Sequence, residues 1–272
     1  MRAVRWNSGT SIRLGAAALF VAIASAALAA DAPPLRVGIA PNYPPLAFKE
    51  NGDLDGIEVD FAQRLEKALG RRIVLVEVAW EELPEALLEK KTIDMIMSGT
   101  SITERRKQRV NFTEPYLEIG QMAIVRQADY PELREPAAMD RPQSRVGFIS
   151  RSTGEAWARE HLKKAKLHGY SDTDEGVRAL QNEQIDYFIQ DAPAVWRVTG
   201  GFINSNPNLR GIYRPLTTEY LAWAVPKDNP ELLEQLNAVL EKWKTDGTLD
   251  DVLDDWITVK KTTIELKPRA DQ

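Results

Sequence analysis

Short apolar runs alternate along this chain with segments whose apolar residues recur every three or four positions. The runs predict buried strands, and the second pattern predicts helices with one buried face. Phe61, Leu65 and Leu69, for example, share one helix face, and Gly70 follows as the residue that ends the helix. Strands that alternate with helices predict βαβ units and a mostly parallel sheet. The strands predicted in this first part are 35–39, 73–78 and 93–97, and the helices end at Leu69 and span 81–90.

The same pattern returns after residue 121. Ser152-Thr153-Gly154-Glu155 has the form of a capping box and predicts a helix that continues to His161. The segment 92–97 (Thr-Ile-Asp-Met-Ile-Met) is echoed at 184–189 (Gln-Ile-Asp-Tyr-Phe-Ile), an offset of 185 − 93 = 92 residues. This spacing is too long for a solenoid repeat, so the echo predicts two similar α/β lobes. The remaining elements predicted here are strands at 122–125, 145–149 and 185–190 and a helix at 174–182.

The C-terminal part contains one apolar run, 221–225, and two helices, the first opened by Asn229-Pro230. One strand and two helices complete the first lobe more readily than they form a third. The predicted fold is therefore α/β with two lobes, each a mostly parallel sheet flanked by helices, and two hinge crossings between them. The predicted boundaries are 34–118 and 218–258 for lobe 1, 119–217 for lobe 2, and 259–272 for a flexible tail.

The first 29 residues have the composition of a cleaved signal peptide. A basic start with three arginines precedes an uncharged, Ala-rich stretch, and Ala27-Leu28-Ala29 supplies small residues for cleavage after Ala29. The stretch is short and poor in strongly apolar residues compared with the roughly 20 that a membrane span needs. The chain has no cysteine, so it has no site for an N-terminal lipid anchor. We predict a soluble periplasmic protein.

The charge of the chain excludes some function classes. Removal of three arginines and no acids changes the formal net charge from −5 to −5 − 3 = −8. An acidic chain without runs of Lys or Arg is not typical of nucleic-acid binding. Two distant histidines and no cysteine give no metal site and no activated nucleophile. The sequence therefore predicts no catalytic residues, no metal and no cofactor.

The segment 93–106 carries the strongest sign of ligand binding. A buried strand runs into Ser98-Gly99-Thr100-Ser101, and a helix starts with Thr103 as N-cap and Arg106 one turn inside. In open α/β sheets such strand ends hold small ligands, and a guanidinium can bind a carboxylate in bidentate fashion. On local spacing alone, an ordinary turn followed by a surface arginine is the better interpretation. The rest of the chain favours the ligand site.

Several short motifs follow one another along the chain in a fixed order. They are Leu-Arg-Val-Gly at 35–38, Tyr43-Pro44-Pro45, Gly56-Ile57-Glu58-Val59-Asp60, the 93–106 segment, Asn111-Phe112-Thr113-Glu114-Pro115-Tyr116, Ile185-Asp186 with Gln190-Asp191, and Asp246-Gly247-Thr248. In this order the motifs resemble those of the family 3 bacterial solute-binding proteins, the periplasmic amino-acid receptors of ABC importers. The resemblance covers about residues 34–258.

The resemblance implies a site for an amino acid between the lobes. Arg106 would bind the α-carboxylate with help from Ser101 and from the helix start at Ser152 and Thr153. Asp191 would face the α-ammonium, with the backbone at Ser98 and Gly99 adding acceptors. Tyr43 and Trp80 would form aromatic walls over the side chain. These residues follow from the family pattern, and they suit a zwitterion, whose two charges must both be met on burial.

Each residue also has a structural interpretation. Asp191 precedes Ala192-Pro193 and could serve only as an N-cap. Ser152 and Thr153 could simply cap their helix, and Tyr43 could be a loop aromatic. The position of Trp80 could belong to Glu81 instead, because the following helix is one residue longer than the family pattern.

Departures from the family pattern bear on specificity. Ala40 stands where receptors for basic amino acids and for glutamine carry Asp, and Ile149 stands where some receptors for polar ligands carry Lys or Gln. Leu46 replaces a usual Phe. These residues predict an amino-acid ligand with an uncharged side chain.

The sequence thus predicts a monomeric binding protein, not an enzyme, that delivers an amino acid to an ABC permease in the inner membrane. One alternative is a dehydratase acting on arogenate or prephenate, as in some relatives of these receptors, and it needs a proton donor. Those enzymes carry Glu three residues after the cleft Asp, whereas this chain has Ala194; Glu118 or Glu219 would then have to supply the acid. A second alternative is a periplasmic sensor or accessory domain.

Overall fold

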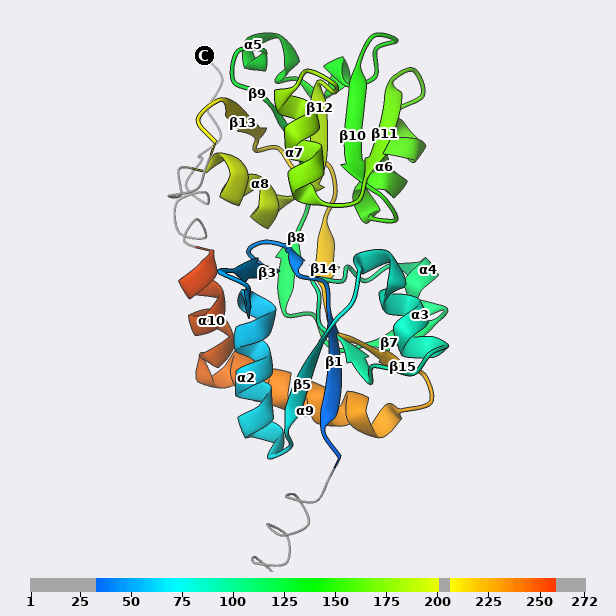
Figure 1. Cartoon of the computed structure of the whole chain (residues 1–272), viewed down its shortest axis with the longest axis vertical. Coiled ribbons are helices and arrows are strands. Elements are labelled where there is room, and N and C mark those ends of the chain that lie inside the picture. Colours follow the sequence, from blue (N-terminus) through cyan, green and yellow to red (C-terminus); the bar gives the residue numbers. More distant parts are fainter. Residues whose placement is uncertain (1–32, 201–205, 258–272) are drawn as a thin grey trace, which may run out of the picture.

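Two lobes, each built on a five-stranded sheet, are stacked along the long axis of the molecule (Figure 1). This computed structural model describes residues 33–200 and 206–257. The predicted signal peptide and the predicted tail from residue 259 lie outside this range. Within it, no helix is long and apolar enough to cross a membrane.

The first lobe combines residues from both ends of the chain. In its sheet β15 runs opposite to the other four strands and comes from the C-terminal segment. In the sequence β15 follows the second lobe, so the C-terminal segment completes the first sheet. In spatial order the strands are β5 (Ile73–Glu77), β1 (Leu35–Ile39), β6 (Met95–Ile96), β15 (Ala224–Pro226) and β7 (Val110–Phe112). The helices are α2 (Ile57–Leu69), α3 (Leu83–Leu88), α4 (Glu104–Lys107), α9 (Pro230–Asp246) and α10 (Thr248–Trp256), and η1 (Trp80–Glu82) is a 3-10 turn before α3.

The second lobe repeats this plan. Its sheet also has one reversed strand, β9, which pairs with β12 on one side and with β13 on the other. In spatial order the strands are β11 (Lys166–Tyr170), β10 (Arg145–Ile149), β12 (Tyr187–Asp191), β9 (Gln121–Arg126) and β13 (Leu209–Ile212). The helices are α5 (Tyr130–Leu133), α6 (Thr153–His161), α7 (Thr173–Gln181) and α8 (Ala192–Thr199), and η2 (Pro136–Ala138) is a 3-10 turn.

The sequence echo corresponds to a repeated contact. Asp94 accepts hydrogen bonds from the backbone N–H and the guanidinium of Arg36, at 2.8 Å to the backbone nitrogen and 2.6 Å to Nη2. Asp186 accepts the same pair of bonds from Arg145, at 2.9 Å and 2.6 Å. In both lobes the aspartate before a buried strand therefore ties that strand to the first residues of its neighbour.

Two short strands form the connection between the lobes. β8 (Leu117–Ile119) and β14 (Glu219–Leu221) pair antiparallel, with Glu219 opposite Ile119, and lie between the two sheets in Figure 1. Gly120 follows β8, and a Cβ there would lie 2.3 Å from the carbonyl oxygen of Thr217. The two crossings therefore pack closely against each other.

A small sheet in the first lobe was not predicted. It contains β2 (Asn42–Tyr43), β3 (Ala47–Glu50) and β4 (Asp53–Asp55). The turn between β3 and β4 has Asn51 and Gly52 at φ 54° and 96°, the left-handed values that a tight hairpin requires. This sheet carries Tyr43 to the edge of the lobe that faces the second lobe.

Three predicted strands differ in detail. The segment 73–78 forms a strand, but it is the half-buried edge of its sheet and not a buried strand. Only two residues of 93–97 pair as a strand. The run 221–225 contributes to two strands, β14 and β15, because the chain leaves the hinge and enters the first sheet within a few residues.

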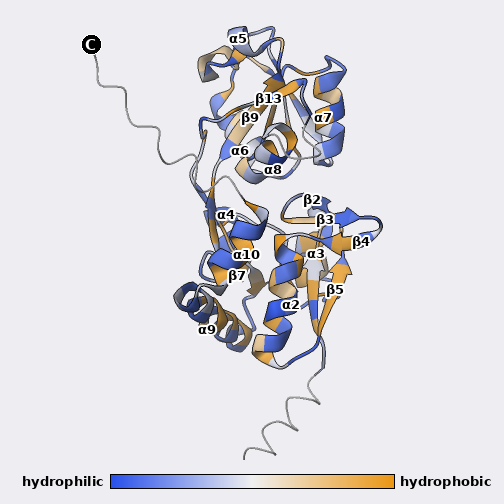
Figure 2. Cartoon of the chain, turned by 90° about the vertical axis from the view of Figure 1, so that its left-hand side faces the viewer, coloured by the Kyte–Doolittle hydropathy of each residue, from blue (hydrophilic) through white to orange (hydrophobic). Residues whose placement is uncertain are grey.

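Apolar residues line the inner faces of both lobes, as the colouring of Figure 2 shows. In the first lobe an aromatic cluster of Phe61, Tyr116, Trp223 and Trp243 joins α2, the start of the hinge and α9, with ring centroids 5.3 to 6.1 Å apart. Because these residues come from distant parts of the sequence, their burial holds the discontinuous lobe together.

Candidate ligand-binding site

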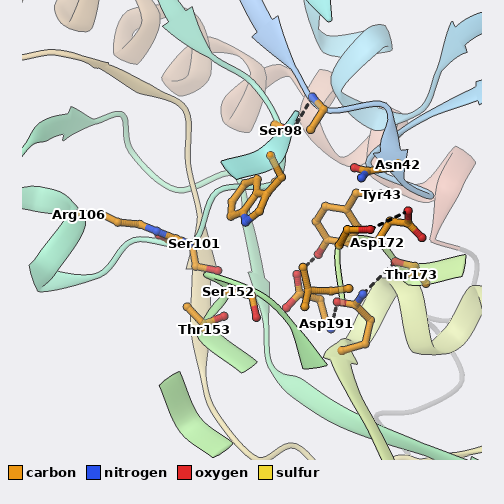
Figure 3. Close-up of a pocket in the computed structure, with 16 residues that line it drawn as sticks. Asn42, Tyr43, Ser98, Ser101, Arg106, Ser152, Thr153, Asp172, Thr173 and Asp191 are labelled. Atoms are coloured by element: carbon orange, nitrogen blue, oxygen red, sulfur yellow. Dashed lines mark hydrogen bonds between the residues drawn. The ribbon is translucent and has the colours of Figure 1, made fainter. Parts of the chain in front are cut away.

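A cavity lies between the lobes, at the ends of strands from both sheets (Figure 3). It contains about 510 Å³ of space, part of it open to solvent. All nine residues predicted as ligand contacts line it: Tyr43, Trp80, Ser98, Gly99, Ser101, Arg106, Ser152, Thr153 and Asp191. The fold therefore brings together residues separated by up to 148 positions in the sequence.

Arg106 supplies the positive charge of the cavity. Thr103 caps its short helix, accepting from the Arg106 backbone N–H at 3.2 Å. The guanidinium donates to the backbone oxygen of Ser101 at 2.8 Å and lies 5.3 Å from the centre of the Trp80 ring. Burial lowers the pKa of Arg106 and the negative charges of Asp191 and Glu219 partly offset this, yet no carboxylate of the described residues pairs with it. The site is thus suited to an incoming carboxylate.

The N-terminus of α6 opens onto the same cavity. Ser152 is the N-cap and its hydroxyl accepts from the Glu155 backbone N–H at 3.2 Å. The reciprocal half of the predicted capping box is shifted by one residue, because Glu155 accepts from the backbone N–H of Arg151 at 2.6 Å. The amides at the start of the helix favour an anion. Ser152 therefore caps the helix, and Ser152 and Thr153 both line the cavity.

Asp191 supplies a negative charge. It stands at the N-cap position of α8, but its side chain makes no capping hydrogen bond. Instead the carboxylate accepts from the Tyr43 hydroxyl of the other lobe and from the Gln121 side chain. The interpretation of Asp191 as only an N-cap is therefore wrong. The carboxylate is directed across the cleft because Tyr43 and Gln121 offer donors there.

The surroundings of Asp191 shift its acidity. Burial is the largest influence, and with the charge of Glu219 it raises the pKa of Asp191 to about 6. The hydrogen bonds from Tyr43 and Gln121 and the charge of Arg106 act in the opposite direction. No cation of the described residues forms an ion pair with Asp191. A ligand ammonium would supply the missing partner and favour the ionised carboxylate.

Gly99 lies where only glycine fits. Its φ is +59°, and a Cβ would lie 2.6 Å from the Tyr43 ring. Its backbone N–H donates to Glu58 at 2.7 Å and is not free for a ligand. Ser98 uses its hydroxyl to accept from the backbone N–H of Ala40 at 3.0 Å. The Gly99 N–H and the Ser98 hydroxyl are thus used within the protein, and Ser98, Gly99 and Ser101 line the cavity.

Tyr43 and Trp80 enter the cavity from different elements of the first lobe. Tyr43 comes from β2, and its ring lies against Gly99 while its hydroxyl reaches Asp191. Trp80 opens the 3-10 turn η1 and lies beside Arg106. The alternative position, Glu81, contributes its backbone oxygen to a contact with Arg151 at 3.3 Å and is not among the residues that line the cavity.

The structure adds polar residues that the sequence analysis missed. Asn42, Ser171, Asp172, Thr173 and Gln190 also line the cavity. Three of them follow β11, a strand that was not predicted because it carries polar residues, Lys and His among them, at 166–170. The rule that ligands bind at the ends of strands would have indicated these residues once β11 was recognised. Ala40 and Ile149, named for specificity, line the cavity as well.

No group of three His, Asp or Glu side chains in the part of the chain that the structure describes is arranged to hold a metal ion. The cavity lining offers one cation, Arg106, and two acids, Asp191 and Asp172, around a partly enclosed volume. It can hold a small molecule that carries both charges.

Comparison with known proteins agrees with this geometry. The family model for "Bacterial extracellular solute-binding proteins, family 3" matches residues 35–259. A Campylobacter jejuni protein named "Probable histidine-binding protein" is 30% identical over 222 residues, which cover 80% of this chain and 83% of that protein. The "L-cystine-binding protein TcyJ" of Escherichia coli is 28% identical over 223 residues, which cover 82% of each chain.

A solved structure is similar in fold. The crystal structure of "the ancestral amino acid-binding protein AncCDT-1, a precursor of cyclohexadienyl dehydratase" has a TM-score of 0.77 and 29% identity. The match covers 85% of this chain and 99% of that one, so both lobes are included.

Proposed function

We propose a function on the premise that this chain belongs to the bacterial extracellular solute-binding proteins, family 3: it captures an amino acid between its lobes and delivers it to an ABC importer. One observation carries the proposal. Arg106 and Asp191 line the same cavity, and neither forms an ion pair with any described residue. A zwitterion would pair with both charges at once. Without such a ligand, burial of the two unpaired charges would cost free energy.

The proposed contacts follow from the positions of the donors and acceptors. Arg106 and the N-terminus of α6 hold the α-carboxylate, and Asp191 holds the α-ammonium. Because Arg106 belongs to the first lobe and Asp191 to the second, the ligand joins the lobes and favours the closed arrangement. Tyr43 and Trp80 enclose the ligand side chain.

For the side chain of the ligand we propose an uncharged, polar group. Ala40 and Ile149 bring no charge to the cavity, and Asn42, Thr173 and Gln190 line it with polar side chains. Gln190 already donates to the Thr173 hydroxyl at 2.9 Å, so Asn42 is the polar side chain of the three that is open to a ligand. Asp172 is the one acid near this part, and its carboxylate caps α7 through the Glu175 backbone N–H at 2.8 Å. A competing ligand class is a basic amino acid, favoured by Asp172 and by the histidine-binding relative.

Calorimetry of refolded protein against histidine, arginine, cystine, glutamine and small neutral amino acids separates these classes. We expect a neutral polar amino acid to bind best and Asp172→Asn to change its Kd by less than about threefold. If Asp172 instead pairs with a ligand cation, Asp172→Asn costs about 1.5–3 kcal/mol, roughly tenfold or more in Kd. A protein that binds none of the amino acids contradicts the proposed function itself.

A dehydratase-like enzyme is the alternative, and the solved relative described as a precursor of cyclohexadienyl dehydratase keeps it open to test. Such chemistry needs an acid beside the leaving hydroxyl. Ala194, at the position of the catalytic Glu in those enzymes, is buried in α8 and does not line the cavity. We expect no phenylpyruvate above the spontaneous rate when the purified protein is incubated with prephenate. Sustained product formation would show that the protein is a dehydratase.

The location and partners follow from the same proposal. We propose a monomer released into the periplasm by cleavage after Ala29, without a lipid anchor, that presents its closed lobes to a permease in the inner membrane. A sensor or accessory role would use the same closed state with a different partner. Neighbouring genes for a permease and an ATPase would favour transport.

A further inference from the structure

Glu219 is a buried acid at the hinge that the proposed contacts do not use. It lies in β14, is 8% exposed, and is not among the residues that line the cavity. Both of its carboxylate oxygens accept hydrogen bonds at 2.7 Å, one from the Ser101 hydroxyl and one from the Thr217 hydroxyl. No cation in the described part of the chain forms an ion pair with it. Burial of a carboxylate that has two neutral donors and no counter-charge costs free energy. This cost indicates that Glu219 has a functional role.

The hydrogen bonds continue from Glu219 into the second lobe. The Thr217 hydroxyl accepts from the backbone N–H of Gln121 at 2.9 Å. The side-chain amide of Gln121, itself 1% exposed, donates to Thr153 at 3.0 Å and to Asp191. One connected network therefore starts at the cavity residue Ser101 in the first lobe, passes through both chain crossings, and ends at cavity residues of the second lobe.

We propose that Glu219 is a positioning residue of the amino-acid site, which orients Ser101 directly and Asp191 through Thr217 and Gln121, and which adds a second negative charge behind the ammonium. The inference rests on the proposed function. The hinge would then take part in ligand recognition. The hydrogen-bond network fixes the position of the first-lobe half of the site relative to the second-lobe half, at the point where the chain crosses between the lobes.

The charge of Glu219 has a measurable consequence at Asp191. Burial and the charge of Glu219 raise the pKa of Asp191, whereas Tyr43, Gln121 and Arg106 lower it. The pKa of Asp191 is about 6 as a result. These four residues come from β14, β2, β9 and α4, and Tyr116, which precedes β8, also interacts with the charge of Asp191. An ammonium binds best to the ionised form, so below this pH a proton must leave before the ligand binds.

The test compares the pH dependence of binding in wild type and Glu219→Gln, with the amino acid that binds best in the panel. In the wild type we expect a Kd that is constant above about pH 7 and rises by up to about tenfold per pH unit below pH 6. In Glu219→Gln the loss of the like charge lowers the pKa of Asp191, so the midpoint of this rise should move down by about one pH unit. Glu118→Gln, an exposed residue opposite Tyr220 in the same hinge pair, is the matched control and should retain the wild-type midpoint.

Thr217→Val tests the hydrogen bonds separately from the charge. It interrupts the network and leaves Glu219 in place, so we expect Kd at pH 7.5 to rise about three- to tenfold with an unchanged midpoint. Midpoints that coincide in wild type and Glu219→Gln overturn the electrostatic part, and an unchanged Kd in Thr217→Val overturns the positioning part. If Glu219→Gln fails to fold, a wild-type Kd that stays constant from pH 5 to 8 overturns the electrostatic part by itself. In all these outcomes the wild type still binds, which distinguishes them from failure of the proposed function.

Discussion

Replacement of Arg106 by alanine should abolish amino-acid binding while the protein remains folded. The guanidinium lines the cavity without a carboxylate partner, and its one short hydrogen bond goes to the backbone oxygen of Ser101. A bound ligand carboxylate would lose its counter-charge in a partly desolvated site, which costs about 3–5 kcal/mol. That corresponds to roughly 200- to 5,000-fold in Kd, enough to move a micromolar ligand out of the range of ordinary calorimetry.

The neighbouring Arg105, exposed on the same short helix, provides the control. Arg105→Ala should bind as the wild type does, and both variants should unfold at nearly the same temperature as the wild type. Arg106→Lys keeps the charge but not the bidentate geometry and should retain an intermediate affinity. Unchanged affinity in a folded Arg106→Ala protein would place the carboxylate site elsewhere.

Replacement of Glu58 by alanine should cause a large loss of stability. Glu58 is fully buried and accepts from the Gly99 backbone N–H at 2.7 Å, the Tyr116 hydroxyl at 2.6 Å and the Trp223 indole at 3.0 Å. Burial raises the pKa of Glu58, while these three hydrogen bonds oppose the rise. Without the carboxylate all three donors would remain buried and unpaired.

Unpaired buried donors cost about 1–3 kcal/mol each, so a total of at least about 3 kcal/mol is expected, on the order of 6–12 °C in Tm for a chain of this size. Calorimetric unfolding measures the change. Arg64→Ala, at an exposed position of the same helix, should be nearly neutral. Glu58→Gln should lie between them, because its amide turns one acceptor into a donor. A Tm within about 2 °C of wild type in Glu58→Ala, well below the expected shift, would show that the donors find other partners.

This network also connects stability to function. Gly99 is held in its left-handed conformation by the bond to Glu58 and by the Tyr43 ring packed against it. Loss of Glu58 should therefore weaken ligand binding even in molecules that remain folded, because the turn that leads to Ser101 is no longer fixed.

Local chemistry was enough to predict the helix ends. Gly70 adopts φ 59° after α2, Thr103 and Ser152 cap α4 and α6 with their side chains, and Asn229 caps α9 through the Leu232 backbone N–H. Each of these depends on a few adjacent residues, so it can be recognised in any stretch of sequence. The repeated lobes were visible for a similar reason, since the aspartates of the echo, Asp94 and Asp186, make equivalent contacts.

Other features depend on contacts that no sequence window contains. The strand β11 was missed because its residues are polar and it lies at a sheet edge, where pairing on one side is sufficient. As a result Asp172 and its neighbours were not expected in the cavity. The side chain of Asp191 could equally have capped α8, and only the approach of Tyr43 from the other lobe decides its direction.

The sequence by itself therefore determined the periodic elements, their capping residues, the two-lobe repeat and, through the family resemblance, nine of the residues that line the cavity. Only the tertiary structure decided how the two halves of the cavity are connected. Glu219 and Gln121 are linked through Thr217 across the hinge although 219 − 121 = 98 positions separate them in the chain. Hydrophobic periodicity reports which face of an element is buried, whereas the partner of a buried polar group depends on which elements pack together.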